Sequence, residues 1–242
     1  MDAIILCGGF GMRFPMSPER PKALLEINGK PLVEHITGKM AAAGVERIYI
    51  STNKRFASDF ERWLSTQRDG SIEIVVENAS SQGEKLGAIG ALRFVIESKR
   101  ISGDLMVING DNAFDDRLDR ALDVFRHESC AVLGTYTAKT TDEAKPFGVV
   151  EINARGEITA FEEKPENPKS KTISTGIYIF PSKTAARIGE YLDSGMSPDQ
   201  PGNFLQWLHK RERIVGVMLK GGWFDVGNEE AYEKAKAALE AD

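Results

Sequence analysis

Glycine and positive charge gather near the start of the chain, directly after an apolar run. Residues 4–7 form the short continuous apolar segment that is typical of a strand buried on both faces. Three glycines follow it: Gly8, Gly9 and Gly11. Glycine tolerates tight turns and lets backbone N–H groups approach an anion, and Arg13 and Lys22 add two positive charges. The segment therefore predicts a polyphosphate-binding loop, although a glycine-rich connection with incidental surface cations would also fit.

Two common phosphate-binding loops do not match this segment. The dinucleotide fingerprint needs a third glycine where Phe14 stands and a helix directly after it, which Pro15 and Pro18 disfavour. The P-loop ends in Gly-Lys-Ser/Thr, whereas Lys22 follows a proline. A hydride-transferring dehydrogenase is therefore disfavoured.

Two carboxylates stand at the ends of other apolar segments. Asp111 follows the predicted strand at residues 105–109 in the tripeptide Gly-Asp-Asn, and Asp225 lies in the segment Trp-Phe-Asp-Val-Gly. Hard oxygen ligands suit Mg²⁺, which usually takes one or two carboxylates together with substrate phosphates. Each acid taken alone is explained equally well as a turn or cap residue.

Composition limits the chemistry further. The 242 residues carry a formal net charge of −5 with acids and bases interspersed, which disfavours a nucleic-acid partner. The histidines His35, His127 and His209 lie in helical patterns, and Cys7 and Cys130 lack metal-ligand spacing. Because the chain has no apolar run of about 18 residues, we expect no membrane partner and a cytoplasmic protein. Chemistry must then rest on carboxylates, lysines and a metal.

Strand and helix patterns alternate in the first half of the chain. Predicted strands occupy residues 4–7, 47–51, 72–76 and 105–109, and predicted helices occupy residues 31–44, 52–67, 83–96 and 117–127. This alternation requires right-handed crossovers and a mainly parallel sheet, whose ligand crevice lies at the carboxyl ends of the strands. The glycine loop and Asp111 both sit at such ends, so two separate segments should meet at one crevice.

The pattern changes to extended runs after residue 128. Candidate strands lie at residues 130–138, 147–152, 158–163, 172–180 and 213–219, with a hairpin turn at 153–156 and helices near 182–192, 201–210 and 229–241. We therefore predict a single α/β domain over residues 1–242. It should be a Rossmann-like, three-layer α/β/α arrangement with a mixed, mainly parallel sheet and an inserted antiparallel portion.

Four separated motifs resemble, in order, those of the sugar nucleotidyltransferase family, the NDP-sugar pyrophosphorylases. They are the glycine loop with its arginine and the Pro-Lys pair at 21–22, Gly-Asp-Asn at 110–112, Glu-Lys-Pro at 163–165 with Thr-Gly-x-Tyr at 175–178, and Trp-x-Asp-x-Gly at 223–227. The resemblance covers about residues 2–235 and is nearest to the glucose-1-phosphate thymidylyltransferase or uridylyltransferase branch. It departs at Met12 and Ala88, where the family usually has threonine.

The resemblance implies the fold and a role for each site residue. It implies a nucleotide-diphospho-sugar transferase fold, with a nucleotide-binding half at about residues 1–128 and a sugar-phosphate-binding half at about 129–242. The catalytic set would be Arg13, Lys22, Asp111 and Lys164, with Asp111 and Asp225 holding Mg²⁺. The nucleotide would lie against Cys7, Gly8, Gly9, Gly11, Gln82 and Gly87. The sugar hydroxyls would meet Asn112, Gly148, Glu163 and Thr175, and Lys164 would hold the sugar phosphate.

These roles imply a nucleotidyltransferase reaction. A sugar 1-phosphate, with glucose 1-phosphate favoured, would attack the α-phosphorus of a nucleoside triphosphate, with dTTP or UTP favoured, and release pyrophosphate. A mannose-1-phosphate guanylyltransferase and a cytidylyltransferase of the same fold remain alternatives. So does a noncatalytic subunit that binds nucleotide sugars and regulates a partner, although it would be expected to lose the charged site residues. No hexapeptide repeat occurs, so any homo-oligomer is expected to form through the core domain.

Overall fold

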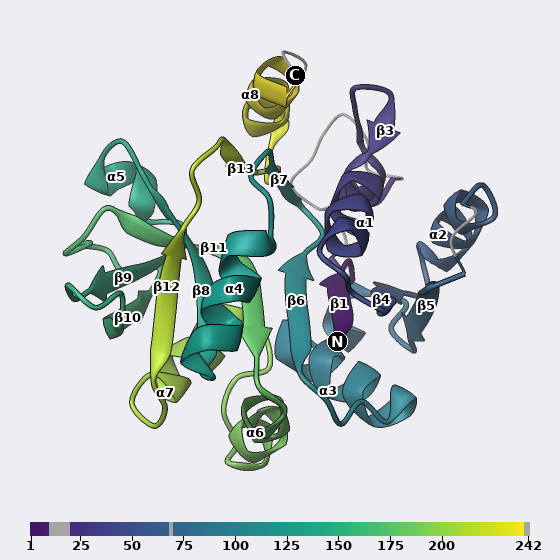
Figure 1. The fold of residues 1–242 in the computed structure, drawn as a ribbon. Helices are drawn as coiled ribbons and strands as arrows, with labels where there is room; N and C mark the ends of the chain where they lie inside the picture. The colour runs from purple at the N-terminus through teal and green to yellow at the C-terminus, as the bar shows by residue number, and fades with distance from the viewer. Residues whose placement is uncertain (10–19, 68–69, 240–242) are drawn as a thin grey trace.

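A nine-stranded sheet forms the centre of the molecule (Figure 1). The computed structural model describes residues 1–9, 20–67 and 70–239. The strands are β1 (Asp2–Leu6), β4 (Arg47–Asn53), β5 (Ile72–Glu77), β6 (Leu105–Asn109), β8 (Ala131–Thr137), β9 (Gly148–Ile152), β10 (Ile158–Glu163), β11 (Thr172–Phe180) and β12 (Ile214–Met218). Their order is β10-β9-β11-β6-β1-β4-β5, and β8 joins β12 to β11.

The strand directions confirm the predicted mixed, mainly parallel sheet. Strand β1 runs parallel to β4 and β6, β4 runs parallel to β5, and β8 runs parallel to β12. Strand β11 is antiparallel to β6, β8 and β9, and β10 is antiparallel to β9. Because β11 pairs with β6, the sheet is continuous between the first and second halves of the chain. That the whole chain is one domain stays a prediction.

Helices cover both faces of the sheet and make the predicted three layers. One face carries α1 (Leu32–Ala42), α2 (Ala57–Leu64) and α4 (Asp119–Glu128), and the other carries α3 (Ala88–Lys99), α6 (Ser182–Asp193) and α7 (Pro201–Leu208). Successive residues of a strand point to opposite faces. Accordingly, Ile5 and Ile108 belong to the first apolar core, whereas Ile4 and Val107 belong to the second. This double burial explains the continuous apolar runs of the parallel strands.

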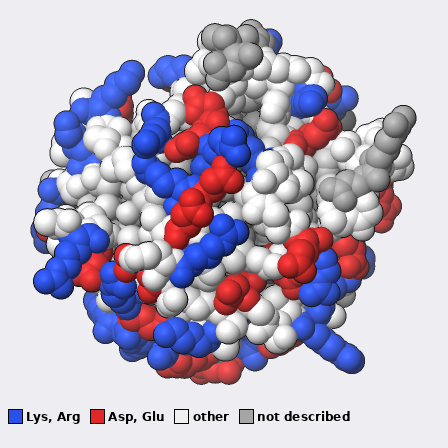
Figure 2. Space-filling model, in the orientation of Figure 1, with Lys and Arg blue, Asp and Glu red and all other residues white. Residues whose placement is uncertain are grey.

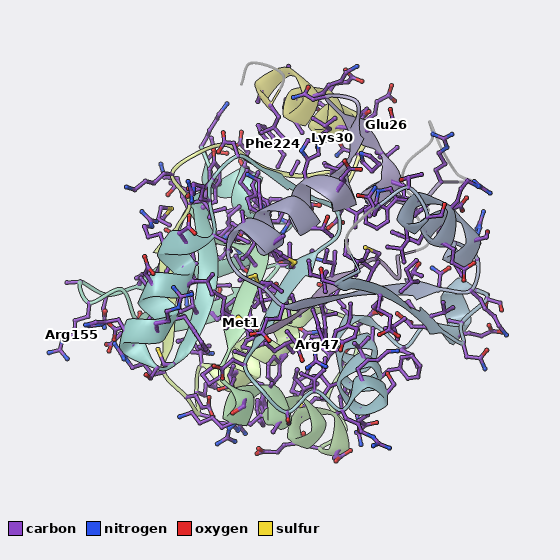
Figure 3. All side chains as sticks on the ribbon, turned by 45° about the vertical axis from the view of Figure 1, so that its right-hand side comes forward. Met1, Glu26, Lys30, Arg47, Arg155 and Phe224 are labelled. Atoms are coloured by element: carbon purple, nitrogen blue, oxygen red, sulfur yellow. The ribbon has the colours of Figure 1, made fainter. Side chains whose placement is uncertain are left out.

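Short elements and one further helix complete the structure. They are β2 (Glu26–Ile27), β3 (Lys30–Pro31), β7 (Asn112–Phe114), β13 (Trp223–Asp225), α5 (Thr141–Ala144), α8 (Glu229–Leu239) and the 3-10 turns η1 (Lys22–Leu24) and η2 (Gln82–Glu84). A third apolar cluster joins α8 to some of these short elements through Ile27, Ala113 and Val226. Glu26, Lys30 and Phe224 lie beside α8 in Figure 3. The Tyr232 hydroxyl donates to the Glu26 carbonyl oxygen over 2.5 Å.

Two predicted helices begin later than expected, and a short strand was missed. The helix expected over residues 83–96 begins only at Ala88, because Gly87 has a φ of 75° and breaks the helix there. The helix expected over residues 52–67 is shorter, because Thr52 and Asn53 end strand β4 and α2 covers only Ala57–Leu64. Strand β13, which pairs with β7, was not predicted from the sequence.

The surface mixes charges of both signs. On the face shown in Figure 2, basic and acidic side chains are interspersed. None of the helices formed by residues 1–9, 20–67 and 70–239 has the length and apolar character needed to cross a bilayer.

Candidate active site

Two carboxylates from distant parts of the chain meet at the carboxyl end of β6. Asp111 follows β6 after a single glycine, and Asp225 ends β13. The antiparallel pairing of β13 with β7 sets Asp225 opposite Asn112, and the Val226 amide donates to the Asp111 carbonyl oxygen over 2.8 Å. The two carboxyl groups share a hydrogen bond. A short strand pairing thus brings together the two acids that were predicted to bind metal.

Burial raises the pKa of both acids. For Asp225, burial is the largest cause and the negative charge of Asp111 adds to it, so that the pKa rises to about 7. For Asp111, burial raises the pKa, while the Lys22 ammonium and the hydrogen bond with Asp225 oppose the rise. Two adjacent, half-buried carboxyl groups cannot both ionise easily without a counter-charge. A divalent cation between them would supply that counter-charge.

The number of acidic ligands fits Mg²⁺. Among the residues that the structure describes, no group of three or more His, Cys, Asp or Glu side chains is arranged to hold a metal. Asp111 and Asp225 therefore offer two carboxylates, and water and substrate phosphates would complete the shell. Mg²⁺ prefers this mixture of ligands, because it sheds its water molecules reluctantly.

Lys22 adds an ammonium group beside the pair. Its Nζ donates to the Gly227 carbonyl oxygen over 3.1 Å, two residues beyond Asp225. Its positive charge lowers the pKa of both acids and so opposes the effect of burial. The other predicted loop residues, Arg13 and Gly11, lie outside the described residues. Lys22 thus places a positive charge beside the two acids.

The raised pKa of Asp225 predicts a pH-dependent stability. The ordinary aspartate value is 3.8, and the folded-state value is about 7. Because the folded pKa lies above the unfolded one, the pair contributes stability at low pH that is lost as the pH rises through about 7. We expect the Tm of the metal-free protein to fall more between about pH 5 and about pH 8 than that of Asp225→Asn. Thermal unfolding in chelator would measure this, and Mg²⁺ should recover the loss at the higher pH. Parallel Tm profiles of the two proteins would contradict the assignment.

A cavity of about 340 Å³ opens beside the acid pair. The sequence-predicted residues that line it are Asp111, Asn112, Gly148, Glu163, Lys164, Thr175 and Asp225. These residues come from loops and strand ends that are far apart in the sequence. The structure therefore collects the predicted metal ligands and the predicted sugar-phosphate residues around one space. Their substrate roles remain a prediction.

Glu163 and Lys164 are held at the mouth of this cavity by the end of β10. The Glu163 amide donates to the Gln206 side chain over 3.0 Å, and the Lys164 amide donates to the Phe147 carbonyl oxygen over 3.0 Å. Burial raises the pKa of Glu163, and the nearby Lys164 ammonium, 4.0 Å away, opposes the rise. Lys164 has a φ of 48°, an unusual value for a non-glycine residue. A carboxylate and an ammonium thus face the cavity side by side.

Two predicted sugar contacts also serve the scaffold. The Asn112 side-chain amide donates to the Thr175 carbonyl oxygen over 2.6 Å, and the Thr175 hydroxyl donates to the Gly134 carbonyl oxygen over 2.8 Å. Thr175 is 1% exposed. Its hydroxyl is therefore committed to β8 rather than presented to the cavity. Gly148 is constrained differently, since an added Cβ would lie 2.5 Å from the Phe161 ring.

A second cavity, of about 210 Å³, lies on the nucleotide side. The predicted residues Gly8, Gly9 and Gly87 line it. Cys7 is placed differently, because its side chain is buried in the first core and burial raises its pKa. Gln82 belongs to η2, and its side chain lies outside the described part of the structure. The predicted nucleobase contacts are thus only partly assembled in one place.

Glu77 is a site residue that was missed from the sequence. It ends β5, lines the smaller cavity and is only 2% exposed. Its carboxylate accepts hydrogen bonds from the Ser51 hydroxyl over 3.2 Å and from the Leu86 amide. A Cβ on Gly8 would lie 2.6 Å from one carboxylate oxygen, so a larger residue there would displace the Glu77 carboxylate. Its position at the carboxyl end of a predicted parallel strand was a usable signal.

Comparison with known proteins fixes the family. A family model described as "Nucleotidyl transferase" matches residues 2–242. The chain belongs to this family. Among curated relatives of this nucleotidyl transferase, the "Bifunctional protein GlmU" of Methanocaldococcus jannaschii is 32% identical over 228 residues, which are 94% of the chain and 51% of the relative. The chain thus spans about half the length of the first curated relatives that it matches.

Other relatives span more similar lengths. The "UTP--glucose-1-phosphate uridylyltransferase AglF" of Haloferax volcanii is 26% identical over 100% of the chain and 98% of that protein. A crystal structure of a Bacillus anthracis protein, assigned as a glucose-1-phosphate thymidylyltransferase, has a TM-score of 0.86 and 27% identity over 98% of the chain and 94% of that structure. These similarities confirm the predicted family and the α/β fold of the nucleotidyl transferase.

Proposed function

We propose that this nucleotidyl transferase joins a nucleoside triphosphate to a sugar 1-phosphate and releases pyrophosphate. The observation that carries the proposal is that the two cavities meet at Asp111, which lines both of them. A nucleotide in the smaller cavity and a sugar phosphate in the larger one would meet beside the acid pair. Such an arrangement holds two anionic reactants together, which is the main requirement of nucleotidyl transfer.

Different residues of the chain would bind the two substrates. Lys22 and the Gly8–Gly9 backbone would hold the triphosphate, with Arg13 predicted to assist. Lys164 would hold the sugar 1-phosphate. An oxygen of that phosphate would form a bond to the α-phosphorus, and the bond from the α-phosphorus to the oxygen bridging to the β-phosphate would break. Because the attacking oxygen is already anionic near neutral pH, no general base is needed.

The acid pair would hold the metal cofactor. Asp111 and Asp225 would bind Mg²⁺, which when bound neutralises phosphate charge and orients the phosphates. On the sugar side, the Glu163 carboxylate and the Gly148 amide can bond vicinal hydroxyl groups, which an apolar wall could not discriminate. Catalysis would then consist of positioning and charge neutralisation.

The pair predicted from the sequence is dTTP or UTP with glucose 1-phosphate. The assignments of AglF as a UTP--glucose-1-phosphate uridylyltransferase and of the Bacillus anthracis protein as a glucose-1-phosphate thymidylyltransferase support this choice. A Sulfolobus acidocaldarius protein assigned as a mannose-1-phosphate guanyltransferase, 29% identical over 99% of the chain and 63% of that protein, supports the guanylyltransferase alternative. The noncatalytic alternative is disfavoured because Lys22, Asp111, Lys164 and Asp225 are all in place. The cytoplasmic location and a homo-oligomer through the core remain predictions.

A substrate panel tests the proposal. The full chain is incubated with Mg²⁺, one of dTTP, UTP, GTP or CTP, and glucose 1-phosphate or mannose 1-phosphate, and pyrophosphate release is measured. We expect one pair to turn over well above the others and chelator to stop the reaction. The same data would assign the base and the sugar. A panel with no pyrophosphate release from any pair would favour the noncatalytic reading.

A further inference from the structure

One ion pair lies where the two cavities meet. Lys85 and Asp199 both line the larger and the smaller cavity, as do Asn109 and Asp111. The Lys85 Nζ lies 2.6 Å from a carboxylate oxygen of Asp199, and the two side chains are 33% and 46% exposed. Lys85 comes from the segment before α3, whereas Asp199 comes from the loop between α6 and α7. The pair therefore links the nucleotide side of the chain to the sugar side.

The loop that carries Asp199 is fixed to the first turn of α3. The Ala88 amide donates to the Asp199 carbonyl oxygen over 3.2 Å, and the Ile89 amide donates to the Pro198 carbonyl oxygen over 2.8 Å. Gly87 has a φ of 75°, and a Cβ there would collide with the Pro198 carbonyl group. Glycine thus permits the close approach of the loop, and the backbone contacts together with the ion pair bring Asp199 to the nucleotide side.

The same loop continues directly into the wall of the sugar cavity. Gln200, Pro201 and Gly202 follow Asp199 and line the larger cavity. Gly202 packs so closely on the Glu163 carboxylate that a Cβ would overlap it. A movement of Asp199 would therefore shift the turn against which Glu163 rests. This turn therefore connects the ion pair, which lines the nucleotide side, to the wall of the sugar cavity.

The charges around the place where the two cavities meet indicate a role for Lys85. Among described residues, the smaller cavity is lined by the carboxylates of Glu77, Asp111 and Asp199, and Lys85 is its one lining cation. A triphosphate placed there would meet mostly negative charge unless the ammonium faced it. Lys164, the other lysine that lines the larger cavity, does not line the smaller one and lies 4.0 Å from Glu163. Lys85 is thus placed to contact a nucleotide in the smaller cavity, in addition to Lys22 beside the acid pair.

We propose that Lys85 binds a phosphate of the nucleotide and that its ion pair with Asp199 couples nucleotide binding to sugar 1-phosphate binding. This inference rests on the proposed function. When a nucleotide phosphate binds the Lys85 ammonium, the ion pair between Lys85 and Asp199 changes. The turn at residues 200–202 then adjusts around the sugar. The competing explanation is a partly exposed ion pair that only tethers the loop and contributes little. Only the proposal predicts that the two substrates affect each other through these side chains.

Binding of non-reacting analogues tests the coupling. The α,β-methylene analogues of dTTP, UTP, GTP and CTP, and glucose 1-phosphate or mannose 1-phosphate, are titrated into the full chain with Mg²⁺ by calorimetry. We expect the analogue that binds best to tighten sugar 1-phosphate binding by about fivefold or more. In Lys85→Met and in Asp199→Asn, the factor by which the analogue tightens sugar 1-phosphate binding should fall to about one. The double variant should show the same factor as either single variant. Lys85→Met should also weaken the analogue itself by roughly tenfold, whereas Asp199→Asn should not.

Control variants and outcomes separate the proposal from its alternatives. Arg93→Met removes another ion pair between α3 and the α6 end, from Arg93 to Asp193 at 2.5 Å, and should leave the factor unchanged. Lys85→Arg should retain part of the coupling. The proposal would be overturned if the analogue still tightened sugar 1-phosphate binding in Lys85→Met or Asp199→Asn. It would also be overturned if no analogue bound to the protein. Coupling without turnover in the substrate panel would instead reject the proposed reaction while the inference stands.

Discussion

Asp111→Asn is expected to lower the turnover rate by roughly 100- to 1,000-fold. This loss corresponds to a rise of about 3 to 4 kcal/mol in the activation free energy, as when one group that stabilises transition-state charge is removed. A neutral amide is a poor ligand for Mg²⁺, and its loss would leave Asp225 alone beside the phosphates. Turnover is measured as pyrophosphate release at saturating substrates over a range of Mg²⁺ concentrations. The Mg²⁺ concentration needed for half the maximal rate should rise together with the loss of rate.

The fold should survive this substitution. Asparagine has nearly the shape of aspartate, and burial disfavours the charge that is removed, as the raised pKa of Asp111 shows. We therefore expect the Tm of metal-free Asp111→Asn near pH 8 to equal or exceed that of the wild type. Asp225→Asn should lose a similar factor in rate, and the double variant should be no worse than either, since the two ligands act as a unit. Asp119→Asn, which changes an exposed acid at the start of α4, is the matched control. An Asp111→Asn enzyme with unchanged rate and metal requirement would remove this residue from the metal site.

Lys164→Met is expected to raise the KM for the sugar 1-phosphate and to lower kcat/KM for it by roughly 10- to 150-fold, the range for losing a charge-assisted hydrogen bond. Methionine keeps an unbranched stem of similar length, so that only the ammonium is lost. The KM for the triphosphate should stay within about twofold, because Lys164 lines the larger cavity and not the smaller one.

The neighbouring lysine provides the control for this experiment. Lys169 forms an ion pair with Glu162 at 3.3 Å, and its side chain is 69% exposed, so Lys169→Met should leave both KM values unchanged. The backbone of Lys164 has a positive φ, and methionine should tolerate it about as well as lysine does, so the Tm should change little. If Lys164→Met raised both KM values equally, its role would be general charge rather than the binding of the sugar phosphate.

Strong periodicity made the central architecture predictable. The apolar runs at residues 4–7 and 105–109 became β1 and β6, because strands covered by helices on both faces must be apolar throughout. Parallel strands place their carboxyl ends at one edge, so the convergence of Gly8 and Asp111 followed from element order alone. The helix expected at residues 83–96 begins late because Gly87 adopts a positive φ, at a place where the Pro198 carbonyl group approaches too closely for a Cβ.

The amino-acid sequence by itself determined the layers, the family and the chemical nature of the site. Glycine, lysine and aspartate at strand ends can be recognised locally, because each has backbone or charge properties that do not depend on distant contacts. Only the tertiary structure decided which groups meet. The three-residue strands β7 and β13 carry too few residues to show a periodic pattern, yet their pairing sets Asp225 beside Asp111. The contact between Lys85 and Asp199 likewise depends on how α3 and the α6–α7 loop pack. Such contacts between distant segments leave no local signal, since each residue alone could equally belong to a solvated loop.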